Sequence, residues 1–223
     1  MITVVTGAGV SASAGIPTYR AQNAVWKDEK FEQYSNAKNY GNHLDYLKPR
    51  WLNIAEKMNE AEPTVFHKFV ADQGWNVITQ NIDGLHKRAG SENVIEIHGS
   101  MSKWRKLKSP SQDTFSVDQV KQENGRIFAE LLDKNNEMKQ VERIRPDVVL
   151  FGERLRQAEE ALNWVKWSDK VIYVGTSGNV FPVADWYVYA QGETILVDPV
   201  SWGNFNKFYE MTADEWVEQF KGF

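Results

Sequence analysis

The segment from Thr3 to Arg20, TVVTGAGVSASAGIPTYR, constrains the fold more than any other part of this chain. The β-branched run from Ile2 to Thr6 is typical of a buried strand. Gly7-Ala8-Gly9 then provides a turn with almost no side-chain bulk, and Ser11 and Ser13 are candidate caps of a following helix. A strand, a glycine turn and a helix start direct backbone N–H groups to one point, where a phosphate can bind. A tight turn without a ligand explains the same residues equally well.

The fingerprint of dinucleotide-binding folds is incomplete in this segment. Ala12 can serve as the third small residue of a G-x-G-x-x-G pattern. The fingerprint also requires an acidic residue about 20 positions further on, at the end of a second strand. Asp28 and Glu29 lie near that distance, but the residues from Ala21 to Lys27 do not resemble a strand. We therefore do not expect an ordinary dehydrogenase layout, and other groups must hold a ribose.

The composition favours one α/β domain with a small insert and excludes several classes of function. The chain has 223 residues, of which 42% are hydrophobic, and a net charge of −4 that gives no global attraction to nucleic acid. No apolar run approaches the roughly 20 residues that span a bilayer, and the first residues lack a signal-peptide layout. The absence of cysteine excludes disulfides, cysteine nucleophiles and thiolate zinc sites. A cytoplasmic location is the expectation that follows.

Polar residues follow two further predicted strands. Gln80-Asn81-Ile82-Asp83-Gly84 follows the strand from Asn76 to Thr79, and His98 follows the strand from Val94 to Ile97. Ligands of parallel sheets bind at the carboxyl ends of strands, so these groups could contact an amide, ribose hydroxyls and a water. A purely structural polar turn is the alternative for residues 80–84. His98 is a candidate general base at the same edge of the sheet.

Five motifs, in this order along the chain, resemble those of the sirtuins, the NAD-dependent protein deacylases. They are GAGVSASAGIPTYR from Gly7, TQNIDGLHKRAG from Thr79, IHG from Ile97, RPDVVLFGE from Arg145, and the stretch from Gly175-Thr176-Ser177 to Pro182-Val183-Ala184. The resemblance spans Thr3 to Pro199. It implies a Rossmann-like parallel sheet with helices on both faces, and a single catalytic domain over residues 1–223.

The resemblance implies NAD-dependent removal of acyl groups from protein lysine side chains, with release of nicotinamide and O-acyl-ADP-ribose. NAD is the implied cofactor, and acylated-lysine peptides or proteins are the implied partners, whereas neither nucleic acid nor a membrane is expected. NAD hydrolysis, ADP-ribosyl transfer and a catalytically silent NAD-binding module stay open as alternatives.

The resemblance also implies roles for individual residues. His98 would be the general base, Asn81 would order the reacting ribose and a water, and Asp83 with the Ile82 main chain would hold the nicotinamide amide. The backbone N–H groups from Gly7 to Ser11 would hold phosphates. The residues implied to bind the cofactor are Gly7, Ala8, Gly9, Ser11, Tyr19, Arg20, Gln80, Asn81, Ile82, Asp83, Gly175, Thr176, Ser177 and Asp198. The residues implied to bind the acyl peptide through their main chain are Val149, Phe151, Gly152 and Glu153.

Asp198 stands where sirtuins generally have an asparagine. Its carboxylate could accept hydrogen bonds from both hydroxyls of the adenine ribose, and its charge should repel a 2′-phosphate. We therefore expect a preference for NAD over NADP.

The main departure from the family lies between its third and fourth motifs. Sirtuins usually carry a zinc ribbon with two cysteine pairs there, but residues 100–145 contain neither cysteine nor histidine. Met101 to Leu107 alternates like a strand, and Arg126 to Leu132 and Met138 to Ile144 could form a hairpin or short helices around the turn-like residues 133–136. We expect apolar packing to replace the metal, through Trp104, Phe115, Ile127, Phe128 and Leu131.

Tyr46 and Arg50 bear on the choice of acyl group. Sirtuins that remove acidic acyl groups carry a tyrosine and an arginine three positions apart on a helix. Here the two residues are four positions apart, with Pro49 between them. The residue types fit and the spacing does not, so acetyl-type and succinyl-type substrates both stay open.

Overall fold

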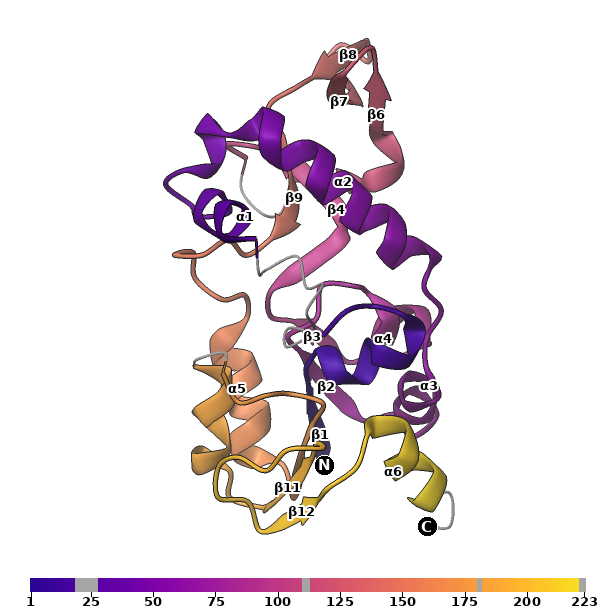
Figure 1. Cartoon of the computed structure of the whole chain (residues 1–223), viewed down its shortest axis with the longest axis vertical. Coiled ribbons are helices and arrows are strands. Elements are labelled where there is room, and N and C mark those ends of the chain that lie inside the picture. Colours follow the sequence, from indigo (N-terminus) through magenta and orange to yellow (C-terminus); the bar gives the residue numbers. More distant parts are fainter. Residues whose placement is uncertain (19–27, 110–112, 180–181, 221–223) are drawn as a thin grey trace.

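The computed structural model describes residues 1–18, 28–109, 113–179 and 182–220 of the chain. Its larger lobe is built on a six-stranded sheet with the strand order β12-β11-β10-β1-β2-β3 (Figure 1). All neighbouring strands of this sheet are parallel. The strands are β1 (Ile2–Thr6), β2 (Asn76–Thr79), β3 (Val94–Glu96), β10 (Lys170–Val174), β11 (Glu193–Val197) and β12 (Lys207–Tyr209). The predicted α/β fold with a parallel sheet is confirmed.

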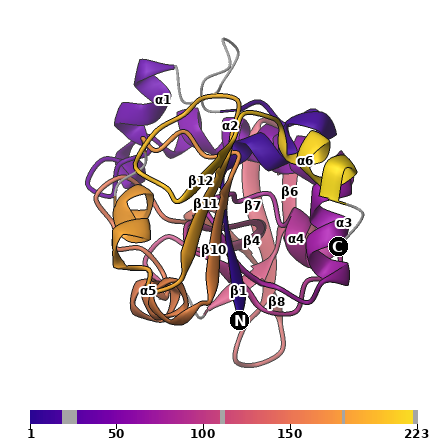
Figure 2. The same cartoon turned by 90° about the horizontal axis from the view of Figure 1, so that it is seen from below.

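Helices cover both faces of this sheet, which Figure 2 shows edge-on. One face packs against α3 (Val65–Asp72), α4 (Leu85–Arg88) and α6 (Ala213–Phe220), and the other against α5 (Ala158–Trp167) and the 3₁₀ helix η5 (Val183–Tyr189). Because successive side chains of a strand point to opposite faces, Val4 of β1 enters the core with Phe66 and Trp216, whereas Val5 enters the core with Tyr173.

The insert forms a second lobe of two small antiparallel sheets, with strand orders β5-β4-β9 and β6-β7-β8. Their strands are β4 (Gly99–Lys106), β5 (Thr114–Ser116), β6 (Val120–Glu123), β7 (Arg126–Leu132), β8 (Met138–Val141) and β9 (Ile144–Val148), with the 3₁₀ helix η4 (Val117–Gln119) before β6. Strands β7 and β8 form the hairpin that was one of the two sequence-based alternatives. The helices of this lobe are α1 (Glu29–Tyr34), η3 (Tyr40–Asn42) and α2 (Leu44–Glu60).

The described part of the insert is held by apolar packing and by one buried lysine. Trp104 and Ile127 lie in the core of this lobe, and Phe115 and Leu131 pack against that core. Phe128 is also buried. Lys48 of α2 was not expected here: its ammonium donates to the carbonyl oxygens of Ile127 at 2.7 Å and Glu142 at 3.3 Å. The ammonium therefore ties α2 to the β-hairpin, and the expected absence of zinc stays a prediction.

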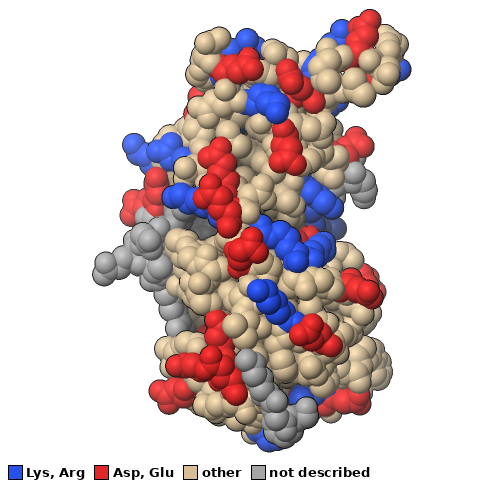
Figure 3. Space-filling model, turned by 90° about the vertical axis from the view of Figure 1, so that its right-hand side faces the viewer, with Lys and Arg blue, Asp and Glu red and all other residues tan. Residues whose placement is uncertain are grey.

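Two further features of the described residues are the distribution of charge on the surface and the apolarity of the helices. On the face that includes the protruding hairpin, acidic and basic side chains are interspersed (Figure 3). No helix within the described residues combines the length and apolarity that crossing a membrane requires.

Two buried histidines pack together under the end of β1. The ring centroids of His67 on α3 and His86 on α4 are 4.5 Å apart. His86 Nε2 lies 3.1 Å from the Thr6 hydroxyl, and His67 Nδ1 lies 2.7 Å from the Thr64 hydroxyl. Among the described residues, the other ring nitrogen of each histidine has no hydrogen-bond partner. Burial lowers the pKa of His67 to about 4 and that of His86 well below its usual value. Both imidazoles are therefore neutral in the folded protein.

We expect this pair to make the fold sensitive to acid. Between pH 6.5 and about 4 the unfolded chain protonates these imidazoles and the folded chain does not, so the free energy of unfolding falls as the pH falls through this window. For His67 alone, the shift corresponds to about 3 kcal/mol at the acidic end. Urea unfolding from neutral pH down to about pH 4.5 measures this dependence. His67→Gln should flatten it, and the control His43→Gln should not. An unchanged slope in His67→Gln would show that other groups cause the acid sensitivity.

Candidate functional site

A cleft of about 560 Å³ lies at the carboxyl ends of β1, β2, β10 and β11, between the parallel sheet and the insert lobe. Most of the residues that the sequence singles out line this cleft. They are Gly7, Ala8, Gly9, Gln80, Asn81, Ile82, Asp83, His98, Val149, Phe151, Gly152, Glu153, Gly175, Thr176, Ser177 and Asp198. Ser11, Tyr46 and Arg50 are not among its lining residues. Tyr19 and Arg20 lie outside the described residues.

The glycine turn packs directly against the turn after β10. Gly7 N–H donates to Val174 O at 3.1 Å, and Gly9 N–H donates to Gly175 O at 2.8 Å. A Cβ on Gly9 would lie 2.6 Å from the Gly175 Cα, closer than real contacts allow. These glycines are therefore required because two backbones touch. Both N–H groups already have protein acceptors, so the expectation that this turn holds a phosphate stays a prediction.

The helix after the turn is the 3₁₀ helix η1 (Ala8–Ala14), and no side chain caps its start. The expectation that Ser11 and Ser13 cap this helix is therefore wrong. The Ser13 hydroxyl instead donates to Asp214 at 2.5 Å. Ser11 is fully buried, and its hydroxyl donates to Asp83 at 2.7 Å.

A buried network orients Asn81. The Asn81 amide nitrogen donates to the Gly7 carbonyl at 3.0 Å and to the Ser11 hydroxyl at 3.1 Å. Asp83 accepts from Ser11 through one carboxylate oxygen, and from the Leu85 N–H at 2.9 Å through the other. Burial raises the pKa of Asp83, while these hydrogen bonds act in the opposite direction. With the amide nitrogen of Asn81 occupied twice, its carbonyl oxygen is the group that a ligand can contact.

His98 is held in one tautomer. Its Nδ1 lies 2.7 Å from the Gln80 carbonyl oxygen, which can only accept, so Nδ1 carries the proton and Nε2 does not. Gln80 is in turn fixed by its side chain, which donates to the Thr176 hydroxyl at 3.1 Å. Burial lowers the pKa of His98, and the hydrogen bond to Gln80 partly offsets this. The imidazole is therefore neutral near pH 7 and can accept a proton at Nε2.

The segment after β9 connects His98 to the insert lobe. Val149 N–H donates to the His98 carbonyl at 2.8 Å. Phe151 N–H donates to Ser35 O at 3.2 Å, and Phe151 O accepts from Ala37 N–H at 3.0 Å. The Leu150 N–H, the Leu150 carbonyl and the Glu153 N–H are also used, within the segment itself. A peptide that adds a strand here would have to pair with the remaining main-chain groups of residues 149–153.

Tyr46 and Arg50 meet on α2, but they point to Asp28 and not into the cleft. The Tyr46 hydroxyl donates to Asp28 at 2.9 Å, and the Arg50 guanidinium lies 3.6 Å above the Tyr46 ring. Pro49 lies inside α2, which begins at Leu44.

Sequence reasoning missed the contribution of α2 and its neighbours to the cleft. Trp51 and Met58 line it, and they are seven positions apart, which places them on one face of the helix. That spacing was the available signal. Further lining residues that lie within the quoted motifs but received no individual role are Ala12, Ile16, Pro17, Thr18, Val148 and Leu150. Lining residues without any such signal are Ser35, Leu155, Pro199, Thr212 and Ala213.

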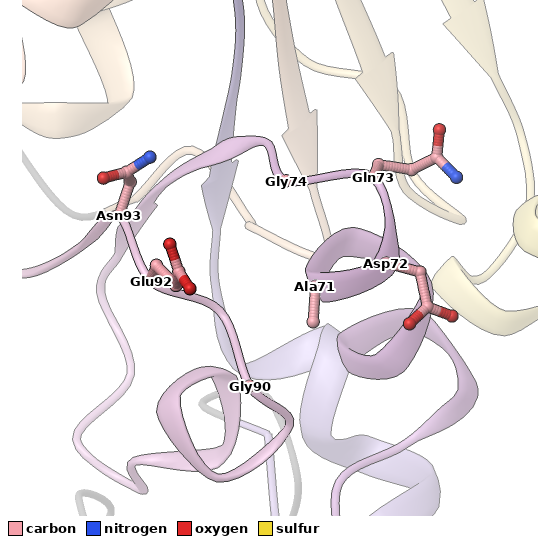
Figure 4. A pocket seen from close by; sticks show the side chains of 7 residues that line it. All are labelled: Ala71, Asp72, Gln73, Gly74, Gly90, Glu92 and Asn93. Carbon is pink, nitrogen blue, oxygen red and sulfur yellow. The ribbon is translucent and has the colours of Figure 1, made fainter.

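A smaller hollow of about 330 Å³ lies at the opposite, amino-terminal ends of β2 and β3 (Figure 4). Its lining residues belong to the end of α3 with the turn that follows it, and to the segment between α4 and β3. The side chains of Asp72, Gln73, Glu92 and Asn93 point away from one another. Converging polar groups are thus found in the cleft and not in this hollow.

Comparisons with known proteins agree on one family. Residues 7–182 match the sequence model of the Sir2 family. An NAD-dependent protein deacylase of Thermococcus kodakarensis is 37% identical over 192 residues, which cover 80% of this chain and 71% of that protein. A Sir2 homologue solved as an NAD complex has a TM-score of 0.82 at 28% identity and covers 98% of this chain and 86% of its own. A Sir2 variant solved with a deacetylated p53 peptide and 3′-O-acetyl ADP-ribose has a TM-score of 0.79 at 27% identity and covers 98% of this chain and 91% of its own.

Proposed function

This chain belongs to the Sir2 family of NAD-dependent protein deacylases, and we propose that its cleft moves acyl groups from lysine side chains of peptides or proteins onto the ADP-ribose part of NAD. The observation that carries the proposal is the meeting of His98, Asn81 and the glycine turn in one cleft. When bound, NAD supplies a ribose carbon that the acyl oxygen can attack as nicotinamide leaves.

The residues present fit such a ligand. The cleft volume of about 560 Å³ is in the range of small-molecule and cofactor sites. Asp83 has both carboxylate oxygens partly used, and a carboxylate has further lone pairs for the nicotinamide amide. Ala8, Ser177 and Asp198 line the same cleft and could contact the rest of a dinucleotide.

The chemistry expected of the protein itself is proton transfer and orientation. His98 Nε2 would take a proton from a ribose hydroxyl, because Nδ1 is held protonated by the Gln80 carbonyl. The Asn81 carbonyl would orient the ribose or a water, because its amide nitrogen is fixed by Gly7 and Ser11. Main-chain groups of residues 149–153 would hold an extended acyl-lysine peptide, which predicts loose sequence preference.

The test of the proposal is nicotinamide release from NAD, with and without an acetyl-lysine peptide, while the peptide mass is followed. We expect release that depends on the peptide, together with loss of the acyl mass. Release without peptide would support the alternative of NAD hydrolysis. Binding of NAD with no release under any condition would instead support a silent NAD-binding module.

We also expect NAD to bind more tightly than NADP. Asp198 is buried at the carboxyl end of β11, and its Oδ1 accepts from Val200 N–H at 2.9 Å. Its negative charge should disfavour a 2′-phosphate by about tenfold or more in Kd, which corresponds to about 1.4 kcal/mol. Calorimetric titration of both nucleotides measures the ratio. Asp198→Asn should lower the ratio of the Kd for NADP to the Kd for NAD, and the control Asp118→Asn should leave this ratio unchanged. Equal affinities for the wild-type protein would refute the assignment.

A further inference from the structure

Five charged side chains form a cluster where the insert lobe joins the cleft. They are Arg105 on β4, Arg145 and Asp147 on β9, and Glu153 and Arg156 after it. Asp147 is 2% exposed and Arg145 is 3% exposed, so these charges are shielded from water. Arg145 donates to both carboxylate oxygens of Glu153, at 2.7 and 2.9 Å.

Arg156 makes the other two-pronged contact of the cluster. Its two terminal nitrogens donate to the two oxygens of Asp147, at 2.6 and 2.5 Å. The Arg105 guanidinium adds a third contact, with its Nε at 3.3 Å from Asp147. Two-pronged arginine–carboxylate pairs fix orientation as well as distance.

This pair lies directly beside the main chain of His98. Arg156 N–H donates to the carbonyl of Ile97, the residue before His98, at 3.1 Å. On the other side, a Cβ on Gly99 would lie 2.9 Å from the Arg156 Cζ and 2.2 Å from the Asp147 carbonyl. Gly99 has a φ of +81°, a conformation that favours glycine, so it provides both the turn and the space for the guanidinium.

The same pair also supports the segment expected to bind the peptide. β4 and β9 pair Ser100 with Asp147 and Gly99 with Val148, and Val149 N–H then donates to the His98 carbonyl. Arg156 itself does not line the cleft. It can therefore act on the reaction only through the groups that it holds.

We propose that Arg156, through its paired contact with Asp147, is a positioning residue that sets His98 against the peptide-binding segment 149–153. This inference rests on the proposed function. Removal of the guanidinium leaves Asp147 buried and, among the described residues, with only the longer charged contact from Arg105, so the turn from Ile97 to Gly99 loses one of its supports. A small displacement of a catalytic group lowers the rate of the chemical step more than it weakens the binding of the substrate.

The experiment compares Arg156→Gln, Arg156→Lys and Arg126→Gln. Arg126 forms an exposed ion pair with Glu142 elsewhere in the insert lobe and serves as the matched control. With an acetyl-lysine peptide, we expect Arg156→Gln to lower kcat by about tenfold or more, with KM for NAD changed less than about twofold. Arg156→Lys should restore part of kcat, because an ammonium reaches one carboxylate oxygen but not both in the same geometry. The control should resemble the wild-type protein.

A second readout does not depend on turnover. The chain has only 4 histidines, so the imidazole signals can be followed by NMR during a pH titration and assigned with His98→Ala. In folded Arg156→Gln, the pKa of His98 should rise toward its ordinary value as the burial of the ring is relaxed. An unchanged kcat and an unchanged His98 titration in the folded variant would overturn the inference. If the wild-type protein does not deacylate but the His98 titration shifts, the positioning role stands and the proposed function fails.

Discussion

We expect His98→Ala to lower turnover of an acetyl-lysine peptide by about 10²- to 10⁴-fold, the usual contribution of a positioned general base. The reason is local: His98 Nδ1 is committed to the Gln80 carbonyl, so only Nε2 can take a proton inside the cleft. NAD should still bind, because the Asn81 network does not include the imidazole. Steady-state kinetics and NAD titration of the variant measure both effects, and retention of more than a tenth of the wild-type rate would refute the role.

Two comparisons make this result specific. Asn81→Ala should also lower the turnover of the peptide, because it removes the side-chain carbonyl that we expect to contact the ligand. His43→Ala should leave kcat unchanged, since His43 stacks on Tyr34 near the start of α2 and does not line the cleft. Because burial lowers the pKa of His98, the acidic limb of the wild-type pH–rate profile should fall below the ordinary histidine pKa of about 6.5. An acidic limb with an apparent pKa above that value would show that a group other than His98 controls it.

Gly9→Ala is the second change with a large expected effect. The new methyl group would lie 2.6 Å from the Gly175 Cα and 2.8 Å from the Gly175 carbonyl oxygen, both of them backbone atoms that cannot rotate away. We expect the free energy of unfolding to fall by about 1–3 kcal/mol, the usual cost of overpacking. We also expect NAD affinity to fall at least about tenfold, since the two turns that line the cleft must move apart.

The control for this change is Gly41→Ala. A Cβ on Gly41 would meet the Leu107 Cδ2 at 3.3 Å and the Arg143 Nη2 at 3.5 Å, and both belong to side chains that can shift. Urea unfolding and NAD titration of the two variants should therefore separate them. If Gly9→Ala and Gly41→Ala have the same stability, the close contact between the two turns is not a determinant of the fold.

Elements with a strong local pattern could be predicted from the sequence. The strand from Asn76 to Thr79 has the predicted bounds. Thr212-Ala213-Asp214-Glu215 has the sequence pattern of a capping box, and in the structure Thr212 and Glu215 bond to each other at the start of α6. Residues that end parallel strands had to share one edge of the sheet, which is why Asn81 and His98 could be placed in one cleft before any contact was known.

Elements without such a pattern were missed or wrongly bounded. Strand β12 is only three residues long and had no predicted counterpart. Helix α2 runs through Pro49, where a local rule favours a helix end. Its Lys48 is buried against the hairpin, and this contact helps to explain why tertiary packing overrides the local preference.

The sequence by itself determined strands such as Ile2 to Thr6 and Asn76 to Thr79, and which polar groups gather at the edge of the sheet, because periodicity and strand ends are properties of neighbouring residues. Only the tertiary structure decided which partner each polar group takes. The N–H groups of Gly7 and Gly9 bond to β10 and its turn, and Asp147 pairs with Arg156 beside His98. Such partners are far apart in the chain or belong to different elements, and their distances depend on how those elements pack, which no local pattern encodes.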